Sequence, residues 1–322
     1  MSKTAKVFLL LAAIAAALTF LMSAQMPNYN QLWRELTNSG HAILFGSVAV
    51  VVLMLSWQLL RGRVPRLRWH YFIAFFVTAF MGGAVEIIQI YTPRDADPYD
   101  FLMDCLGAAS FLCIVAAFDK RLKRPSPAAG ESRRKAGLTL AGLCFFALAF
   151  LSPGLWATAM ITRDADFPTI CGFDSYWETK WIHTVRARLE RVPPPPGFTT
   201  ARGMVGKFTA LKGAFPKMDF IEVDPDWRGY SSLNLDIFSQ LDHPVNMAIR
   251  IDDVHHNDRF EDRFNRRLVV QPGLNHYVID MNDILNAPKG RQMDLEHITH
   301  VLIFGVFPRQ PFTVYIDNFR LQ

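Results

Sequence analysis

The sequence contains little cysteine. Its 322 residues include only four cysteines. Cys105, Cys113 and Cys144 lie inside apolar runs, and Cys171 stands alone in the more polar half of the chain. No pair has the CxxC spacing of a zinc or redox site, and residues so scattered make no disulfide framework. We therefore interpret all four as small core residues.

Several motifs and one charge pattern are also absent. No GxxxxGK[ST], HExxH or GxSxG occurs, so nucleotide-driven chemistry and the common hydrolase mechanisms have no support. The net charge is +5, but most of the excess sits in two short stretches, residues 61–68 and 120–135. Basic loops between apolar runs indicate membrane topology first. We expect no nucleic-acid partner.

Apolar sequence, in contrast, is abundant. The chain is 51% hydrophobic and has 26 phenylalanines, which is more than an ordinary soluble protein carries. Before about residue 160, five stretches reach or approach the roughly 20 residues that a helix needs to cross hydrocarbon: 7–25, 40–60, 69–91, 101–118 and 137–158. The pattern predicts a transmembrane helical bundle over 1–120, then a basic loop and a fifth helix over 121–162.

Positive charge predicts the orientation of these helices. The N-terminus with Lys3 and Lys6, and both basic stretches, belong on the cytoplasmic side. The helices then alternate, and everything after about residue 160 faces the extracytoplasmic space. We expect a multi-pass protein of the inner (cytoplasmic) membrane with a periplasmic C-terminal domain. A signal peptide cleaved after Ala24 is the competing interpretation of the first stretch, but its long apolar core favours a retained helix.

Residues 163–202 are predicted to link the two halves. In the segment 174–192, Trp177, Trp181, Val185 and Leu189 recur every fourth position, which predicts an amphipathic helix. This helix would lie either on the membrane surface or, as we favour, against its own soluble domain. The four prolines 193–196 would end it.

From about residue 203 the pattern becomes that of strands. Segments such as "LNLDIFSQ", "NMAIRIDD" and "FTVYIDNFRL" alternate or run apolar for a few residues between turn signals. Short strands without intervening helices predict an all-β jelly-roll sandwich over 203–322. The predicted fold is therefore multidomain, with an all-α bundle followed by an all-β sandwich.

Polar side chains gather at the predicted extracytoplasmic edge of the bundle. Glu86 and Gln89 share one helix face, and Asp100 and Asp104 share a face of the next helix. Topology alone predicts that three helices bring together His41, Glu86, Gln89, Arg94, Asp100 and Asp104. Ionisable residues inside a span are costly and usually pair or do work. Either Arg94 neutralises the acids and holds the hairpin together, or the surplus carboxylates meet a cation or a cationic or hydroxylated ligand. A role of His41 and Glu86 as an acid/base pair stays open.

The same residues carry a resemblance. The pattern Glu86, Gln89, Pro93, Arg94, Asp100, Asp104, Gly107, with His41 in "GHAILFG", resembles the VanZ-like family of integral membrane proteins over about residues 5–120. Asp104 stands where that family usually has asparagine, and Asn38 where an acidic residue is common before the histidine. The resemblance implies a role in the cell envelope, since the family is named for a protein associated with glycopeptide resistance, and it implies no settled reaction.

The soluble half resembles the galactose-binding-like jelly rolls used as carbohydrate-binding modules, over about residues 200–322, in segments such as "DWRGYSSLNLDIFSQLDHPVNMAIRIDD" and the closing "FTVYIDNFRL". Sugar binding needs aromatic faces and planar polar groups. The candidates are Trp227, Tyr230, Arg259, Arg263 and Arg266, beside the polar residues His255, His256, Asn257 and Asp258. The alternative is that Trp227 packs inside the sandwich and that the charged stretch is a solvated loop with ion pairs.

Metal binding has weak support. Asp252, Asp253, His255 and Asp258 match no standard metal motif. The resemblance allows a structural calcium with Asp317 as one ligand, although the strand position of Asp317 equally suits a hydrogen-bonding role, and we expect no other cofactor. Three functions remain open: a glycan-binding envelope protein whose membrane-edge cluster recognises a lipid head group, an enzyme acting on a lipid-linked envelope glycan, and a protein-docking module of an envelope assembly.

Overall fold

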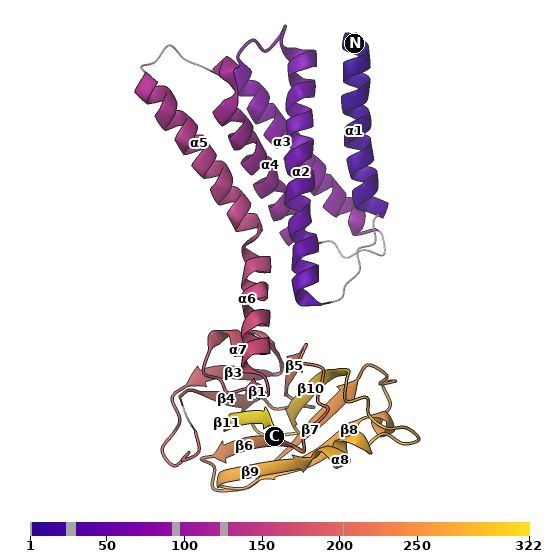
Figure 1. Ribbon diagram of the computed structural model, residues 1–322, viewed down its shortest axis with the longest axis vertical. Coiled ribbons are helices and arrows are strands. Elements are labelled where there is room, and N and C mark those ends of the chain that lie inside the picture. The colour runs from indigo at the N-terminus through magenta and orange to yellow at the C-terminus, as the bar shows by residue number, and fades with distance from the viewer. Residues whose placement is uncertain (1, 24–29, 92–96, 123–127, 202) are drawn as a thin grey trace. The chain divides into compact units, whose positions relative to one another are not determined.

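The computed structural model describes residues 2–23, 30–91, 97–122, 128–201 and 203–322. The chain divides into two compact units, Met1–Ala157 and Thr158–Gln322, which we call the helical unit and the sandwich unit (Figure 1). The fold class predicted from the sequence, long apolar helices followed by an antiparallel β-sandwich, is confirmed.

The helical unit contains α1 (Lys3–Ser23), α2 (Gln31–Leu60), α3 (Leu67–Gln89), α4 (Pro98–Phe118), a short 3-10 turn η1 (Lys120–Leu122) and α5 (Ala128–Ala149). α4 packs against α2, α3 and α5. Local signals set the helix starts, since Asn30 caps α2 and Asp97 caps α4, whose first residue is a proline. Among the described residues, α1 to α4 are long and apolar enough to cross a membrane.

The predicted fifth span is broken. α5 and α6 (Leu151–Asp166) pass the same test only as a pair, and they bend by 53° at their junction. Pro153 explains the bend, because it has no amide hydrogen to donate to the carbonyl of Ala149 four residues earlier. The hydroxyl of Ser39 on α2 donates to that carbonyl instead, at 2.7 Å.

The sandwich unit is built from two antiparallel sheets (Figure 1). In the first, β3 (Ala187–Val192), β4 (Val205–Ala210), β11 (Phe312–Leu321), β6 (Ser232–Ser239) and β9 (Gly273–Asp280) lie in that order, and β1 (Thr169–Cys171) also pairs with β11. The second, which we call sheet B, has the order β2 (Ile182–Val185), β5 (Lys217–Ile221), β10 (Ile298–Gly305), β7 (Val245–Asp253) and β8 (Phe264–Val270). One-turn helices α7 (Tyr176–Lys180) and α8 (Met281–Leu285) and a 3-10 turn η2 (Phe260–Asp262) complete the unit.

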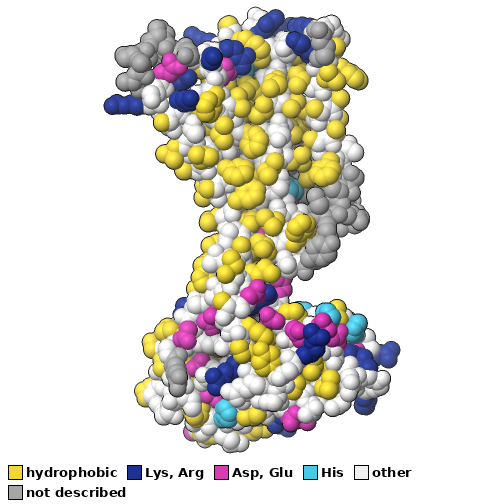
Figure 2. All heavy atoms as spheres, viewed as in Figure 1, with side chains coloured by type: hydrophobic (Ala, Val, Ile, Leu, Met, Phe, Trp, Pro, Cys, Tyr) yellow, Lys and Arg dark blue, Asp and Glu magenta, His cyan; other side chains and the backbone are white. Residues whose placement is uncertain are grey.

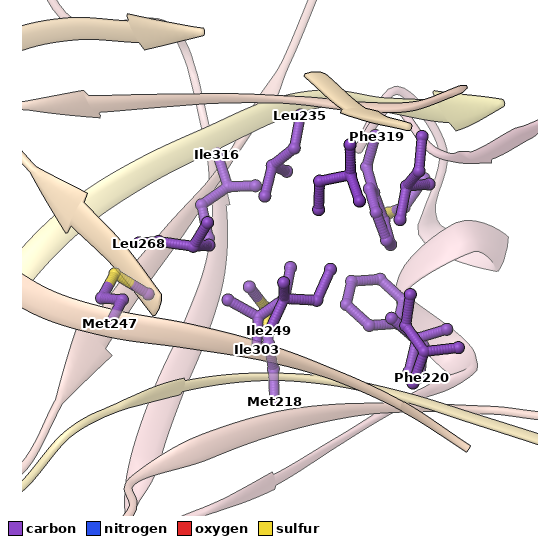
Figure 3. Packing of buried hydrophobic residues seen from close by; sticks show 14 of the residues in the cluster. Met218, Phe220, Leu235, Met247, Ile249, Leu268, Ile303, Ile316 and Phe319 are labelled. Carbon is purple, nitrogen blue, oxygen red and sulfur yellow. The ribbon is translucent and has the colours of Figure 1, made fainter. Parts of the chain in front are cut away.

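Apolar side chains from both sheets form one core (Figure 3). Leu235 and Ile316 point inward from the first sheet, and Met218, Ile249 and Ile303 point inward from sheet B. Alternate residues of each strand therefore face inward, as the two-residue period of a strand requires.

The predicted amphipathic helix 174–192 is wrong. Only α7 is helical there, and β2 and β3 follow it as strands. The apolar residues recur every fourth position, and this spacing does not distinguish the two structures. It is close to one turn of a helix and also equals two repeats of a strand. The sandwich therefore already includes residues 169–192, before the position 203 at which the sequence placed its start.

Candidate functional site

A histidine and two carboxylates meet where α2 packs against α4. His41 Nδ1 lies 3.2 Å from Asp104 Oδ1, and His41 Nε2 lies 3.8 Å from Asp100 Oδ2. Only 13% of the His41 side chain and 1% of the Asp104 side chain are exposed. The imidazole is thus held between two acids on one face of α4, away from solvent.

Two glycines make this approach possible. A Cβ on Gly107 of α4 would lie 1.9 Å from the carbonyl oxygen of Ala42, the residue after His41. A Cβ on Gly82 of α3 would lie 2.6 Å from Asp104 Oδ2. Small residues therefore let α2 and α3 both close on the segment of α4 that carries Asp104.

Glu86 and Gln89 lie near the end of α3. Glu86 Oε2 accepts a hydrogen bond of 3.0 Å from the backbone amide of Asp97, while Glu86 Oε1 is buried and has no hydrogen-bond partner among the described residues. Gln89 is also buried, at 3% exposure. Pro93 and Arg94 fall outside the described residues.

The described part of this cluster is acidic. It holds the carboxylates of Glu86, Asp100 and Asp104 and a single group that can become cationic, His41. Asp104 Oδ2 is buried without a hydrogen-bond partner among the described residues. Such a cluster suits a proton, a cation or a donor of hydrogen bonds. No group of three or more His, Cys, Asp or Glu side chains in the described ranges has the geometry to hold a metal ion.

Of the predicted glycan-binding residues, Trp227 lies in the interior and Tyr230 is partly buried against it. Trp227 is fully buried, and its indole nitrogen donates to the carbonyl of Asp224 at 2.9 Å. Tyr230 packs against the core and meets the ring of Phe167 edge-on, with ring centroids 5.6 Å apart. The expectation that Trp227 presents its face to a sugar is wrong, because the ring fills the sandwich.

The three predicted arginines lie at the surface, in different surroundings. Arg259 is exposed in the loop before η2. Arg266 reaches from β8 to the carbonyl of Val278 at 3.3 Å, across the open edge of the sandwich. Arg263 is half-buried with its guanidinium 5.3 Å from the centroid of the Phe260 ring, and its Nε is buried without a hydrogen-bond partner among the described residues.

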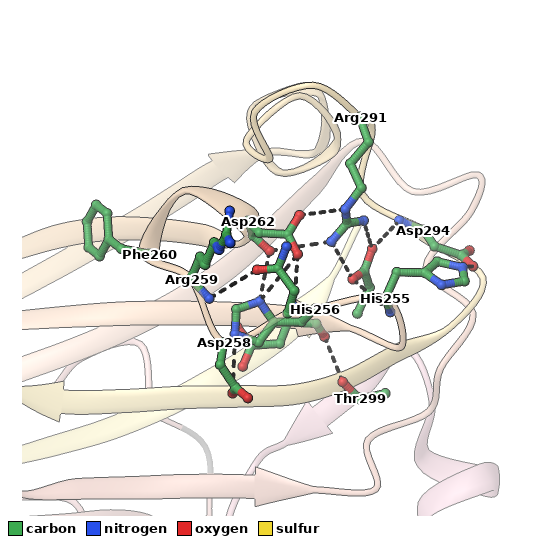
Figure 4. A network of polar contacts seen from close by, with 12 residues as sticks. His255, His256, Asp258, Arg259, Phe260, Asp262, Arg291, Asp294 and Thr299 are labelled. Atoms are coloured by element: carbon green, nitrogen blue, oxygen red, sulfur yellow. Dashed lines mark hydrogen bonds and ion pairs between the residues drawn. The ribbon is translucent and has the colours of Figure 1, made fainter.

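The charged stretch 252–263 forms a network of hydrogen bonds and ion pairs (Figure 4). Arg291 forms ion pairs with Asp253 and Asp262, and the hydrogen bond from Arg291 lowers the pKa of Asp262. His256 Nδ1 lies 2.9 Å from the carbonyl oxygen of Asp262. The sequence did not identify Arg291, which lies 38 residues after Asp253.

Asp252 and His255 have other partners. Arg250 pairs with Asp252 at 2.6 Å, and His255 Nε2 lies 3.4 Å from Asp294 Oδ2. For the suggested calcium, Asp317 is buried and accepts a hydrogen bond of 2.7 Å from the amide of Asn318.

The outer face of sheet B carries residues that sequence reasoning missed. Asp219, Leu302 and Arg250 are direct cross-strand neighbours on β5, β10 and β7, and His183 and Asn265 extend this row to β2 and β8. His300 lies one repeat along β10, and its Nδ1 is 3.1 Å from Asp219 Oδ1. The row crosses five strands, and the four spacings between them, of about 4.8 Å each, make it about 19 Å long.

Three phenylalanines stand at one end of this face. The ring of Phe215 lies 4.4 Å from that of Phe307 and 5.6 Å from that of Phe304, measured between centroids. Phe215 and Phe307 are 46% and 60% exposed. Both have positive φ, 49° and 45°, which is uncommon for bulky residues and often marks a functional position. The two-residue alternation of "HVLIFGVF" could have indicated which residues of β10 face outward. It could not indicate their neighbours on this face, because the adjacent strands are far apart in sequence.

Comparison with known proteins gives similarities to solved structures only. No protein-family model matches this chain, and no curated protein matches it in sequence. An exo-β-agarase structure has a TM-score of 0.39 at 18% identity, covering 48% of this chain and 24% of the agarase. A family 11 carbohydrate-binding module from Clostridium thermocellum, in complex with a β-1,3-1,4-mixed-linked tetrasaccharide, has a TM-score of 0.34 at 10% identity, covering 44% and 86%. A family 30 carbohydrate-binding module from a Clostridium thermocellum cellulase has a TM-score of 0.31 at 15% identity, covering 44% and 90%. The match thus spans about a quarter of the agarase.

Proposed function

We propose that this chain is a multi-pass protein of the cell envelope, related to the VanZ-like family, whose sandwich binds glycan on the outer face of sheet B. Four apolar helices of spanning length support the membrane assignment, and the basic stretches at one end of the helical unit favour a cytoplasmic location for that end. The sandwich then faces the extracytoplasmic side.

The glycan proposal rests on one observation: polar and aromatic side chains lie together on the outer face of sheet B. A sugar offers hydroxyl groups at its rim and C–H groups on its flat sides, so its site needs planar polar groups beside aromatic rings. The outer face of sheet B has Asp219, Arg250 and His300 in its middle, the Phe215, Phe304 and Phe307 rings at one end, and the Arg263 and Phe260 pair by β8. A row about 19 Å long fits a short oligosaccharide.

The test is binding of the full-length protein, purified in a neutral detergent, to immobilised polysaccharides. His300→Gln and Phe307→Ser change two exposed positions of this face and should each weaken retention at least tenfold. Val278→Ser is the matched control, because Val278 is 49% exposed on the opposite sheet. No retention on any polysaccharide, or equal retention by all variants, would reject the proposal and favour the protein-docking alternative.

A second role concerns the membrane-edge cluster of His41, Glu86, Asp100 and Asp104. Its excess of carboxylates supports recognition of a cationic or polyhydroxylated lipid head group. Mass spectrometry of lipids retained by the purified protein tests this. Asp104→Asn removes one charge with little change of shape and should reduce retention, whereas Asp242→Asn, at an exposed carboxylate of the sandwich unit, should not.

The contact between His41 and Asp104 keeps the enzymatic alternative open, since an imidazole beside a buried carboxylate has the arrangement of a general base. In that case the substrate would be a lipid-linked envelope glycan. Full turnover by folded His41→Ala and Glu86→Gln proteins would rule out catalysis by these residues.

A further inference from the structure

A hollow lies in the helical unit, away from the acidic cluster. It has a volume of about 480 Å³ and is walled by α3, α4 and α5. Phe72, Phe75 and Phe76 line one side, and Ala109 and Cys113 line the floor. Its lining is apolar throughout, and the hydroxyl of Tyr71 is engaged elsewhere, because it donates to Asp119 Oδ2 at 2.8 Å.

The length of the hollow matches one leaflet of a bilayer. It extends along α3 from Arg68 to Phe76, which is eight residues and about 12 Å at 1.5 Å per residue. One leaflet is half of the roughly 30 Å hydrocarbon core, or about 15 Å. The hollow therefore begins at the basic end of the helical unit and stops near the middle of the bundle.

Basic residues border the hollow. Arg68 contributes apolar atoms to the lining, its guanidinium lies 5.9 Å from the centroid of the Trp69 ring, and it has no ion pair within the described residues. Arg121, in contrast, is paired with Asp119 at 2.8 Å. Arg134 donates to the carbonyl of Leu122, another residue of the lining, at 2.8 Å. In the view of Figure 2, Lys and Arg side chains gather at this end of the helical unit.

We propose that this hollow holds an acyl chain of an anionic phospholipid, with the lipid phosphate at Arg68. The proposal rests on the membrane assignment made above. Basic pockets between spanning helices on the cytoplasmic side suit anionic head groups, and a guanidinium matches the geometry of a phosphate. The apolar wall below Arg68 supplies the site for the chain.

The volume of the hollow suits a lipid chain. At about 480 Å³ it is within the range of about 300–1,000 Å³ for small-molecule sites.

The experiment measures lipids bound to the full-length protein in neutral detergent by native mass spectrometry. The probes are dioleoyl phosphatidylglycerol, dioleoyl phosphatidylcholine and dihexanoyl phosphatidylglycerol. We expect one phosphatidylglycerol to bind at least tenfold more tightly than phosphatidylcholine, and the short-chain lipid to bind at least tenfold more weakly than its dioleoyl form. Equal binding of the two dioleoyl lipids, or equal binding of the short and long chains, would overturn the proposal.

Variants separate the contributions of head group and chain. Arg68→Gln should abolish the preference for phosphatidylglycerol, and Ala109→Phe should fill the hollow and reduce binding of both dioleoyl lipids. Arg66→Gln and Ala147→Phe are the matched controls, because Arg66 and Ala147 do not line the hollow, and both should bind as the unmodified protein does. Cys113→Leu fills less of the space and serves if Ala109→Phe does not fold. Unchanged binding by Arg68→Gln and by a folded filling variant would reject the site.

A separate experiment distinguishes failure of the membrane assignment from failure of the lipid site. If alkaline carbonate extracts the protein from membranes, the proposed function itself fails. If the protein stays in the membrane yet shows no preference for anionic lipid, only the lipid site fails.

Discussion

Ser39 on α2 donates a hydrogen bond to the carbonyl oxygen of Ala149, the acceptor that Pro153 leaves without its helical donor. Both groups are buried, so the carbonyl has no water to replace this partner. Ser39→Ala should destabilise the helical unit by about 1–3 kcal/mol, the cost of a buried unpaired polar group. Thermal unfolding in detergent measures this. Pro153→Ala restores an amide donor, so Ser39→Ala should cost less in a Pro153→Ala background, and an equal cost in both backgrounds would contradict the explanation.

The contact of Gly107 with Ala42 gives a second prediction. Gly107→Ala would put a methyl carbon 1.9 Å from a backbone oxygen, and neither helix can yield without separating α2 from α4. We expect a loss of 3 kcal/mol or more, at the upper end of overpacking costs of about 1–3 kcal/mol, with loss of the contact between His41 and Asp104. Gly137→Ala is the control, because nothing lies within 4 Å of its Cβ. It should be neutral or slightly stabilising.

The ion-pair network of the sandwich depends on Arg291. Asp253 is almost fully buried and pairs with this guanidinium. Arg291→Met would leave that carboxylate without its cation and should cost about 3–5 kcal/mol, measured as a lower melting temperature of the sandwich unit. Arg309→Met, at an exposed position, should have little effect. A melting temperature unchanged by Arg291→Met would show that the network does not stabilise the unit.

The pair of His300 and Asp219 predicts a pH dependence. The hydrogen bond to Asp219 raises the pKa of His300, and partial burial opposes the rise. A histidine with a folded-state pKa above the unfolded value of about 6.5 stabilises fully below that pH, and this stabilisation disappears as pH rises through the folded-state pKa. Because 47% of the side chain is exposed, solvent screening keeps the effect below about 1 kcal/mol.

Melting curves of the unmodified protein and of His300→Gln between pH 5 and 9 measure this difference. The two should differ most below about pH 6.5 and converge at alkaline pH. A difference in melting temperature that grows with pH would contradict the predicted direction of the effect.

Much of the helical unit could be predicted because long apolar helices are recognisable from the length of their apolar runs. Topology also predicted that His41, Asp100 and Asp104 would meet, since consecutive spans reverse direction. The structure brings these three together. It adds nothing about Arg94, which lies outside the described residues.

The sandwich was harder to predict in detail. The i, i+4 spacing of residues 177–189 fits a helix and a strand equally, and only pairing with β4 and β5 decides between them. Trp227 could not be assigned to the interior because a lone aromatic has no period. The outer face of sheet B depends on β5, β10 and β7 being neighbours, and strand order in an antiparallel sandwich cannot be read from local sequence.

The position of β11 has a consequence for biosynthesis. β11 lies between β4 and β6 in the middle of its sheet and also pairs with β1, the first strand after the helices. The ribosome must therefore translate through Leu321 before the sandwich can close, long after the residues of the helical unit have emerged. During that interval the earlier strands have exposed hydrogen-bonding edges. With the extracytoplasmic location that we propose for the sandwich, these strands would cross the membrane in an unfolded form that chaperones or proteases can reach.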